Sequence, residues 1–131
     1  MKIKNILLLL NILLFHGFVK CQSQSEKINI TIFDGTIVAG YVDQGAYLNF
    51  LGPNINLVKG NSKITLGMLP SLRFKEDNNT PKNSFVTPNL GGGITYAYKN
   101  IAFQIPFYYN SKTSSKNGKW VTGIGVGYRF K

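Results

Sequence analysis

The side chains that most often perform catalysis or bind metals are scarce in this chain of 131 residues. Its one histidine is His16 and its one cysteine is Cys21, and both lie near the N-terminus. If that segment is removed on export, no imidazole base and no thiol nucleophile remain. A Ser-His-Asp triad and metal sites built on histidine or cysteine are then excluded. We therefore expect no catalytic residue, no metal site, no cofactor and no enzymatic activity.

The acidic residues and the glycine run also have ordinary explanations. Glu76 and Asp77 are adjacent in a polar stretch, and their surroundings lack the ligand alternation of a calcium loop. Asp34 and Asp43 are interpreted as turn residues. The three glycines at 91–93 lack the following helix and the Lys-Ser/Thr of a phosphate-binding loop, so we expect them to pack on the inner face of a strand.

The N-terminal segment has the composition of a secretory signal peptide. Two lysines precede a nearly unbroken apolar run at 6–15, which is too short to span a bilayer as a helix, and a polar transition leads to Cys21. We predict a signal peptide at 1–21 and a single β-barrel domain at 22–131. Cys21 is either removed with the signal peptide or acylated as the first residue of a lipoprotein, although Lys20 is not the small residue that usually precedes such a cysteine.

The charge of the chain is strongly basic. The formal net charge is +10, and residues 22–131 carry twelve Lys and Arg against five Asp and Glu, hence +7. An exported protein seldom meets nucleic acid, so we expect no nucleic-acid partner. Anionic lipid headgroups or lipopolysaccharide are the expected counterparts, and a plain basic surface in solution is the alternative.

The last dozen residues, WVTGIGVGYRFK, alternate between two contrasting faces. One face has aromatic ends and an aliphatic middle: Trp120, Thr122, Ile124, Val126, Tyr128 and Phe130. The other is almost free of side chains: Val121, Gly123, Gly125, Gly127 and Arg129. Aromatic girdles around an aliphatic band are typical of a membrane-spanning barrel strand.

This stretch resembles the closing strand of Gram-negative outer-membrane β-barrels, which usually end in an aromatic-x-aromatic signal, here Tyr128 and Phe130. Lys131 follows where such strands have a terminal Phe. The resemblance implies a location in outer-membrane lipid and recognition of the C-terminal strand by the outer-membrane assembly machinery. The last strand of a soluble sandwich or lipocalin-like barrel is the alternative.

Alternation with a period of two recurs along the chain, and no stretch has a convincing helical period. The sequence predicts an all-β fold: an antiparallel up-and-down meander closing into a small barrel of about eight strands. The count becomes six if 28–42 and 46–59 are each a single long strand. Asp34-Gly35 is a hairpin or a bulge, and Gly52-Pro53-Asn54 is a turn or a bulge; the pattern leaves both open. Pro70 indicates an edge or a bulge beside it.

The lengths of the connections provide a separate argument. They are long at 76–83 and 110–119 and short at 60–61 and 99–100, as external loops and periplasmic turns alternate in outer-membrane barrels. Such barrels begin at eight strands, which favours the higher count. The strands around 46–59 would then have only about six residues, against the nine to eleven of a spanning strand.

We therefore expect a non-enzymatic outer-membrane β-barrel with a lumen packed by glycine, alanine, threonine and a few Lys and Arg. Its role would be structural, or surface interaction through external loops 76–83 and 110–119. The lipid-facing or interfacial residues would be Tyr96, Tyr98, Phe103, Phe107, Tyr109, Trp120, Tyr128 and Phe130, with Tyr108 beside them. The candidate headgroup contacts are Lys82, Lys112, Lys116 and Lys119.

The alternative is a secreted or periplasmic β-barrel or sandwich that binds an apolar ligand among Tyr96, Phe103, Phe107 and Trp120. The two hypotheses differ in whether the polar or the apolar face of the strands is in contact with water. A soluble protein should expose Lys63, Thr65, Arg73 and Lys75, whereas a membrane barrel should enclose them. No pattern in the sequence indicates an oligomeric state.

Overall fold

The computed structural model describes residues 26–76, 80, 82, 84–112 and 116–130. The predicted signal peptide at 1–21, with Cys21, lies outside the described residues. Within them there is no helix, and hence none long and apolar enough to cross a membrane. Eight strands are present: β1 (Lys27–Thr31), β2 (Thr36–Val42), β3 (Gly45–Phe50), β4 (Asn54–Lys59), β5 (Ser62–Phe74), β6 (Val86–Tyr98), β7 (Ile101–Asn110) and β8 (Lys119–Arg129).

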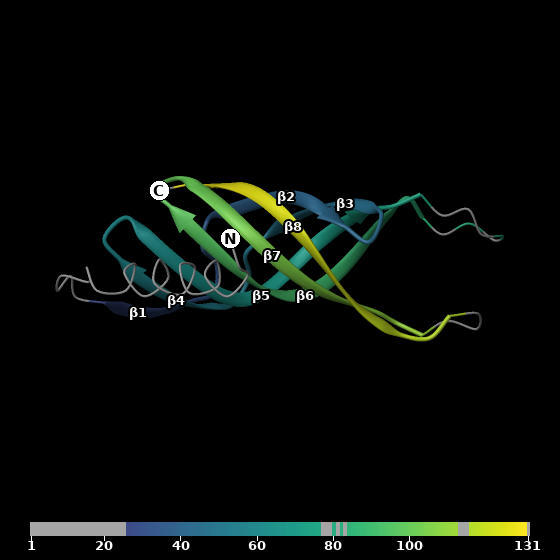
Figure 1. The fold of residues 1–131 in the computed structure, drawn as a ribbon, viewed down its shortest axis with the longest axis horizontal. Helices are drawn as coiled ribbons and strands as arrows, with labels where there is room; N and C mark the ends of the chain where they lie inside the picture. The colour runs from purple at the N-terminus through teal and green to yellow at the C-terminus, as the bar shows by residue number, and fades with distance from the viewer. Residues whose placement is uncertain (1–25, 77–79, 81, 83, 113–115, 131) are drawn as a thin grey trace, which may run out of the picture.

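The strands form an antiparallel meander in which six close into a small barrel (Figure 1). The ring runs β5-β3-β2-β8-β7-β6 and returns to β5. Strand β4 continues the path of β3 along β5, and β1 pairs with β4 as β2 pairs with β3. The all-β meander and the count of eight strands are confirmed. The ring has six members because the first two regions are long strands, each broken once.

The break between β3 and β4 is a bulge and not a turn. Asn49 pairs with Ser71 and Asn54 pairs with Gly67, so four residues on one strand face three on β5. The ladder continues through the break, because Gly52 N donates to Met68 O and Met68 N donates to Pro53 O, both at 3.0 Å. The extra residue reverses the phase, so odd-numbered side chains are buried in β3 and even-numbered ones in β4.

The break between β1 and β2 is not a hairpin either. These strands do not pair with each other, and β2 pairs instead with β8. Gly35 has a φ of +64°, and its carbonyl oxygen accepts a hydrogen bond of 2.9 Å from Phe130 N. The hairpin interpretation of Asp34-Gly35 is therefore wrong, and a break within one strand path is correct.

The connections gather at two ends of the barrel, as Figure 1 shows. At the loop end lie the end of β5, the start of β6, the end of β7, the start of β8 and the tight turn at Asp43–Gln44. The terminal end has the turns 60–61 and 99–100, the start of β1 and the end of β8. The predicted alternation of long and short connections is confirmed, except that the first connection at the loop end is short.

The barrel is polar inside and apolar outside. On β5, Lys63 and Arg73 are only 3% and 6% exposed, whereas the intervening Leu66 is 57% exposed. The buried polar residues are Thr36, Asn49, Asn54, Asn56, Lys63, Thr65, Ser71, Arg73, Thr95 and Gln104. The apolar part of the interior is a small cluster of Val38, Val42, Tyr47, Leu51, Leu69 and Tyr108.

Glycines on the inner face make room for two tyrosines in the lumen. The rings of Tyr47 and Tyr108 meet edge to face with centroids 5.9 Å apart. A Cβ atom at Gly91 would lie 2.5 Å from the Tyr108 ring, and one at Gly125 would overlap the Tyr47 hydroxyl. The predicted lumen of small residues is thus correct for β6 and β8, except that Gly92 faces outward with Leu90 and Ile94. Two tyrosines and the leucines Leu51 and Leu69 fill the remaining space.

Gly127→Ala is expected to weaken the seam between β2 and β8, where the ring closes. The new methyl group would overlap the Ile37 carbonyl oxygen and lie 2.7 Å from Val38 Cγ2. Overpacking of this kind costs about 1–3 kcal/mol in the free energy of unfolding. Urea titration followed by the fluorescence of Trp120, the only tryptophan, measures it.

The matched control is Gly92→Ala, because a Cβ atom there would have only the Gly67 carbonyl oxygen nearby, at 3.8 Å. Equal stabilities of the two variants would contradict the role assigned to Gly127.

Candidate functional site

All eight aromatic residues predicted to face lipid lie on the outer face, with exposed fractions between 41% and 70%. Those near the terminal end are Tyr96, Tyr98, Phe103, Tyr128 and Phe130; those nearer the loop end are Phe107, Tyr109 and Trp120. Two contacts join neighbours within these groups, with ring centroids 5.3 Å apart for Tyr109 and Trp120 and 5.1 Å apart for Tyr128 and Phe130. Between the groups lie exposed aliphatic residues: Leu66, Met68, Ile94, Ile105, Ile124 and Val126.

Tyr108 does not belong to this outer surface. Its side chain is fully buried in the lumen, where its hydroxyl lies 2.6 Å from Ser71 Oγ. The prediction of an interfacial role is wrong because successive side chains of β7 point to opposite sides, and Tyr109 is the outward one.

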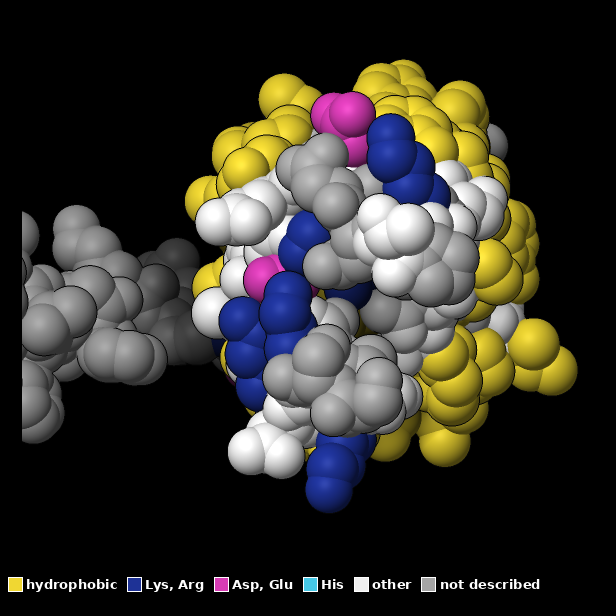
Figure 2. Space-filling model, turned by 90° about the vertical axis from the view of Figure 1, so that its right-hand side faces the viewer, with side chains coloured by type: hydrophobic (Ala, Val, Ile, Leu, Met, Phe, Trp, Pro, Cys, Tyr) yellow, Lys and Arg dark blue, Asp and Glu magenta, His cyan; other side chains and the backbone are white. Residues whose placement is uncertain are grey.

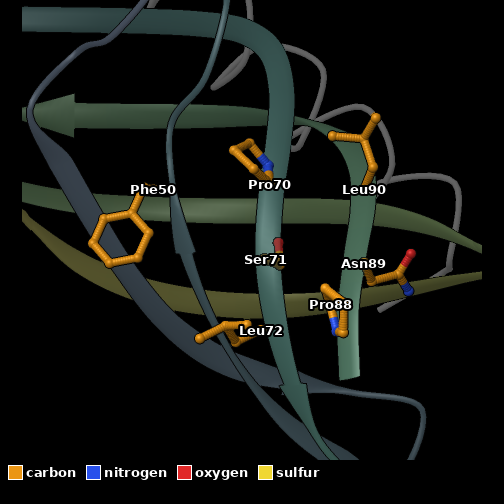
Figure 3. A pocket seen from close by; sticks show the side chains of 7 residues that line it. All are labelled: Phe50, Pro70, Ser71, Leu72, Pro88, Asn89 and Leu90. Atoms are coloured by element: carbon orange, nitrogen blue, oxygen red, sulfur yellow. The ribbon is translucent and has the colours of Figure 1, made fainter. Parts of the chain in front are cut away.

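A shallow apolar hollow lies on the outer face over β3, β5 and β6 (Figure 3). Its lining residues are Phe50, Pro70, Ser71, Leu72, Pro88, Asn89 and Leu90. Pro70 lies beside the bulge, as its missing N–H requires, and Gly52 lies opposite it. Pro88 lies where β6 has run past its pairing with β7. The hollow presents no group of converging charged side chains that would do chemistry.

The middle of the lumen contains a connected network of uncharged polar groups. Gln104 Oε1 accepts hydrogen bonds from Asn49 Nδ2 at 2.5 Å and from Tyr47 Oη at 3.3 Å. Gln104 Nε2 donates to Thr95 Oγ1 at 2.9 Å. These groups satisfy one another away from water, so the network stabilises the interior and offers no reactive group.

An ion pair lies inside the barrel toward the terminal end. Lys63 Nζ donates to Asp34 Oδ1, and the two side chains are 4% and 9% exposed. Thr36 Oγ1 also donates to Asp34 Oδ2, at 2.9 Å. Asp34, expected only to shape a turn, is therefore the counter-ion of a buried lysine.

A second charge cluster forms the mouth of the lumen at the loop end. Asp43 Oδ2 accepts hydrogen bonds from Asn110 Nδ2 at 2.8 Å, Lys75 Nζ at 3.0 Å and Arg73 Nη2 at 3.4 Å. Lys119 Nζ lies 3.7 Å from the other carboxylate oxygen. We call these five residues the mouth cluster. Seen from the loop end, Lys and Arg side chains gather toward the middle and hydrophobic side chains surround them (Figure 2).

The charges of the mouth cluster keep its carboxylate ionised. Burial raises the pKa of Asp43, but hydrogen bonds from Lys75 and Asn110 and the charges of Lys75 and Lys119 outweigh it and lower the pKa to about 2. Asp43 occupies the tight turn with a φ of +47°, a conformation that Asp and Asn tolerate better than most residues.

The four lysines predicted to contact headgroups all belong to the loop end. Lys82, Lys112 and Lys116 lie on the two long connections and are exposed, whereas Lys119 begins β8 and joins the mouth cluster. The mouth cluster was not predicted from the sequence. One feature of the sequence could have indicated it. The polar face of the strand at 63–75 has several Lys and Arg residues, which need carboxylate partners, and the whole chain has only five Asp and Glu.

Among the described residues, no three His, Cys, Asp or Glu side chains come together as a metal site would require. No protein-family model, no curated protein and no solved structure matches the chain.

Asp34→Asn is expected to destabilise the barrel strongly, because it leaves the Lys63 ammonium buried without its counter-ion. Breaking a buried pair in this way costs about 3–5 kcal/mol. Urea unfolding of the refolded protein measures the loss.

The double variant Asp34→Asn/Lys63→Met removes the orphaned charge and should recover most of the stability. A double variant as unstable as Asp34→Asn would contradict this account of the pair.

Proposed function

We propose that this chain is exported by its signal peptide and forms a small, non-enzymatic outer-membrane β-barrel with a packed, non-conducting lumen. Its role is structural, or surface interaction through the external loops 76–83 and 110–119. The observation that carries the proposal is the inverted barrel: charged and polar side chains inside and aliphatic and aromatic side chains outside.

The apolar outer face supports a lipid environment on energetic grounds. Soluble monomers rarely expose contiguous apolar patches larger than a few hundred Å². Here exposed large apolar side chains occur on all six strands of the ring and on β1 and β4: examples are Tyr41, Phe50, Leu66, Ile94, Phe103, Val126, Ile30 and Ile55. Lipid tails solvate such a surface, and closure of the ring satisfies the backbone within it.

The lengths of four strands agree with those of strands that span a bilayer. Strands β5 to β8 have 13, 13, 10 and 11 residues, against the nine to eleven that a tilted spanning strand needs. The short strands β1 to β4 are halves of two longer strand paths, so their individual lengths need not reach that of a spanning strand. A ring of six is narrower than single-chain outer-membrane barrels, which begin at eight strands. So narrow a lumen has room only for side chains.

The partners that follow are outer-membrane lipid and lipopolysaccharide. The two groups of outer aromatic residues suit the two interfaces of a bilayer, where Tyr and Trp are enriched. The exposed lysines of the long connections suit anionic headgroups. The strand that ends in Tyr128 and Phe130 is proposed to be recognised by the outer-membrane assembly machinery.

Cell fractionation tests the location. The protein is expected in the membrane fraction, to be released only by detergent, and to migrate differently in gels before and after boiling, because a closed barrel resists unfolding by detergent. Recovery from the soluble periplasm without a mobility shift would reject the proposal and favour a secreted or periplasmic protein that binds an apolar ligand.

A lysine scan along β7 tests which surface meets lipid. Ile105 and Ile101 point outward with nearly equal exposed fractions, 52% and 55%, but Ile101 directly follows the turn at 99–100. In a bilayer, Ile105→Lys should cost about 2–4 kcal/mol and Ile101→Lys about 0–1 kcal/mol, because the penalty depends on depth.

Urea unfolding from phospholipid vesicles measures both variants of β7. Since the two positions are equally exposed, a barrel surrounded by water would respond to both substitutions alike, and equal losses would contradict the lipid-facing assignment.

A further inference from the structure

The mouth cluster contains more positive charge than its carboxylate can neutralise. Arg73, Lys75 and Lys119 all lie within 4 Å of Asp43, so three cations share one anion. Asp43 stays ionised at neutral pH, and no other Asp or Glu among the described residues forms an ion pair with these three. The cluster therefore keeps a local charge of +2 in a partly enclosed site, where screening by salt is weaker than on an open surface.

The arginine in the cluster has unused donor capacity. Arg73 Nη1 donates to Asn110 Oδ1 at 2.8 Å and Nη2 reaches Asp43 at 3.4 Å. Among the described residues no acceptor lies within reach of Nε, although the side chain is only 7% exposed. The guanidinium also lies over the Tyr108 ring, at 5.7 Å from its centroid, which holds it in place. A positioned guanidinium has the planar donor geometry that recognises phosphate.

The two lysines come from opposite sides of the ring, at the loop end, and both are accessible to solvent. Lys75 follows β5 and Lys119 begins β8, and their side chains are 39% and 66% exposed. The β2–β3 turn with Asp43 bridges them. An anion arriving from the loop end would therefore meet two accessible ammonium groups before it reached the buried arginine.

We infer that the mouth cluster is a binding site for a phosphate-type anion, with Lys75 and Lys119 as its accessible ligands and Arg73 as its buried one. The inference goes beyond the proposed membrane role and does not depend on it, because the cluster faces the loop end and not the outer apolar surface. The phosphate can come from a lipid headgroup or from a free ion.

Asp43 is expected to compete with the bound anion. Its carboxylate already occupies the partners that an incoming phosphate needs, so it competes with the ligand. Replacing it by Asn removes the competing charge and keeps a residue that tolerates the left-handed backbone of the turn. The site thus predicts opposite effects for two changes in one cluster: loss of the lysines weakens binding and loss of the carboxylate strengthens it.

The experiment is a titration of the refolded full-length mature protein with inorganic phosphate, followed by the Nε–H resonances of its two arginines. Arg73 is expected to shift, while Arg129 at the terminal end serves as an internal reference. Lys75→Gln/Lys119→Gln should weaken the apparent affinity about three- to tenfold, and Asp43→Asn should strengthen it by a similar factor.

The matched control is Lys27→Gln/Lys99→Gln, which removes the same charge at the terminal end and should leave the affinity unchanged. If both double variants lowered the affinity for phosphate equally, overall charge would explain the effect, and the site would be overturned. An Arg73 resonance that does not respond to phosphate, or a weakened affinity in Asp43→Asn, would overturn it as well.

A second arm distinguishes the sources of the phosphate. The same variants are placed in nanodiscs of phosphatidylcholine with or without phosphatidic acid. An Arg73 shift that requires phosphatidic acid and is lost in Lys75→Gln/Lys119→Gln supports the site and assigns a lipid headgroup. A response confined to inorganic phosphate supports the site and assigns the free ion. Failure of fractionation to find the protein in membranes would leave the titration with inorganic phosphate intact.

Discussion

A ring of only six strands encloses very little space, and most features of this protein follow from what can be fitted inside it. Tyr47 and Tyr108 occupy the middle of the lumen and meet edge to face. They fit because the facing positions on β6 and β8 are glycines, which allow ring and backbone to come close. The alternation of glycine along β8 is therefore a condition for closing the ring, and it leaves Trp120, Ile124, Val126 and Tyr128 on the outside, whereas Val121 packs against the core.

The narrow interior also determines where charge is placed. Lys63 and Arg73 point inward because they alternate with the aliphatic residues of β5, and a buried charge needs a partner. Asp34, in the break between β1 and β2, pairs with Lys63, and Asp43, in the β2–β3 turn, pairs with Arg73. One end of the lumen is balanced by a single pair, whereas the other gathers three cations around one carboxylate. That asymmetry distinguishes the loop end as the end suited to a ligand.

Much of this arrangement could be predicted residue by residue from the chain alone. Alternation assigned Phe103 and Phe107 to one face and Gln104 to the other, and the structure confirms these faces. The sequence left a choice open where a local pattern suits two different structures. Asp34-Gly35 suits a hairpin as well as a break in one strand, and the choice depends on whether β2 pairs with β1 or with β8. The counter-ion roles of Asp34 and Asp43 were missed because their charged partners lie 29 or more residues away in the chain.

The sequence by itself determined the all-β architecture, the two faces of each strand, the main connections and the thin inventory of reactive groups. These are local properties, set by the two-residue period of a strand and by turn-forming residues. Only the tertiary structure decided that six strands close the ring, that the breaks at 32–35 and 51–53 are not hairpins, and that the polar face is the enclosed one. Those outcomes depend on which distant strands pair and on how much volume the closed ring leaves, and neither quantity is encoded in any one stretch of the chain.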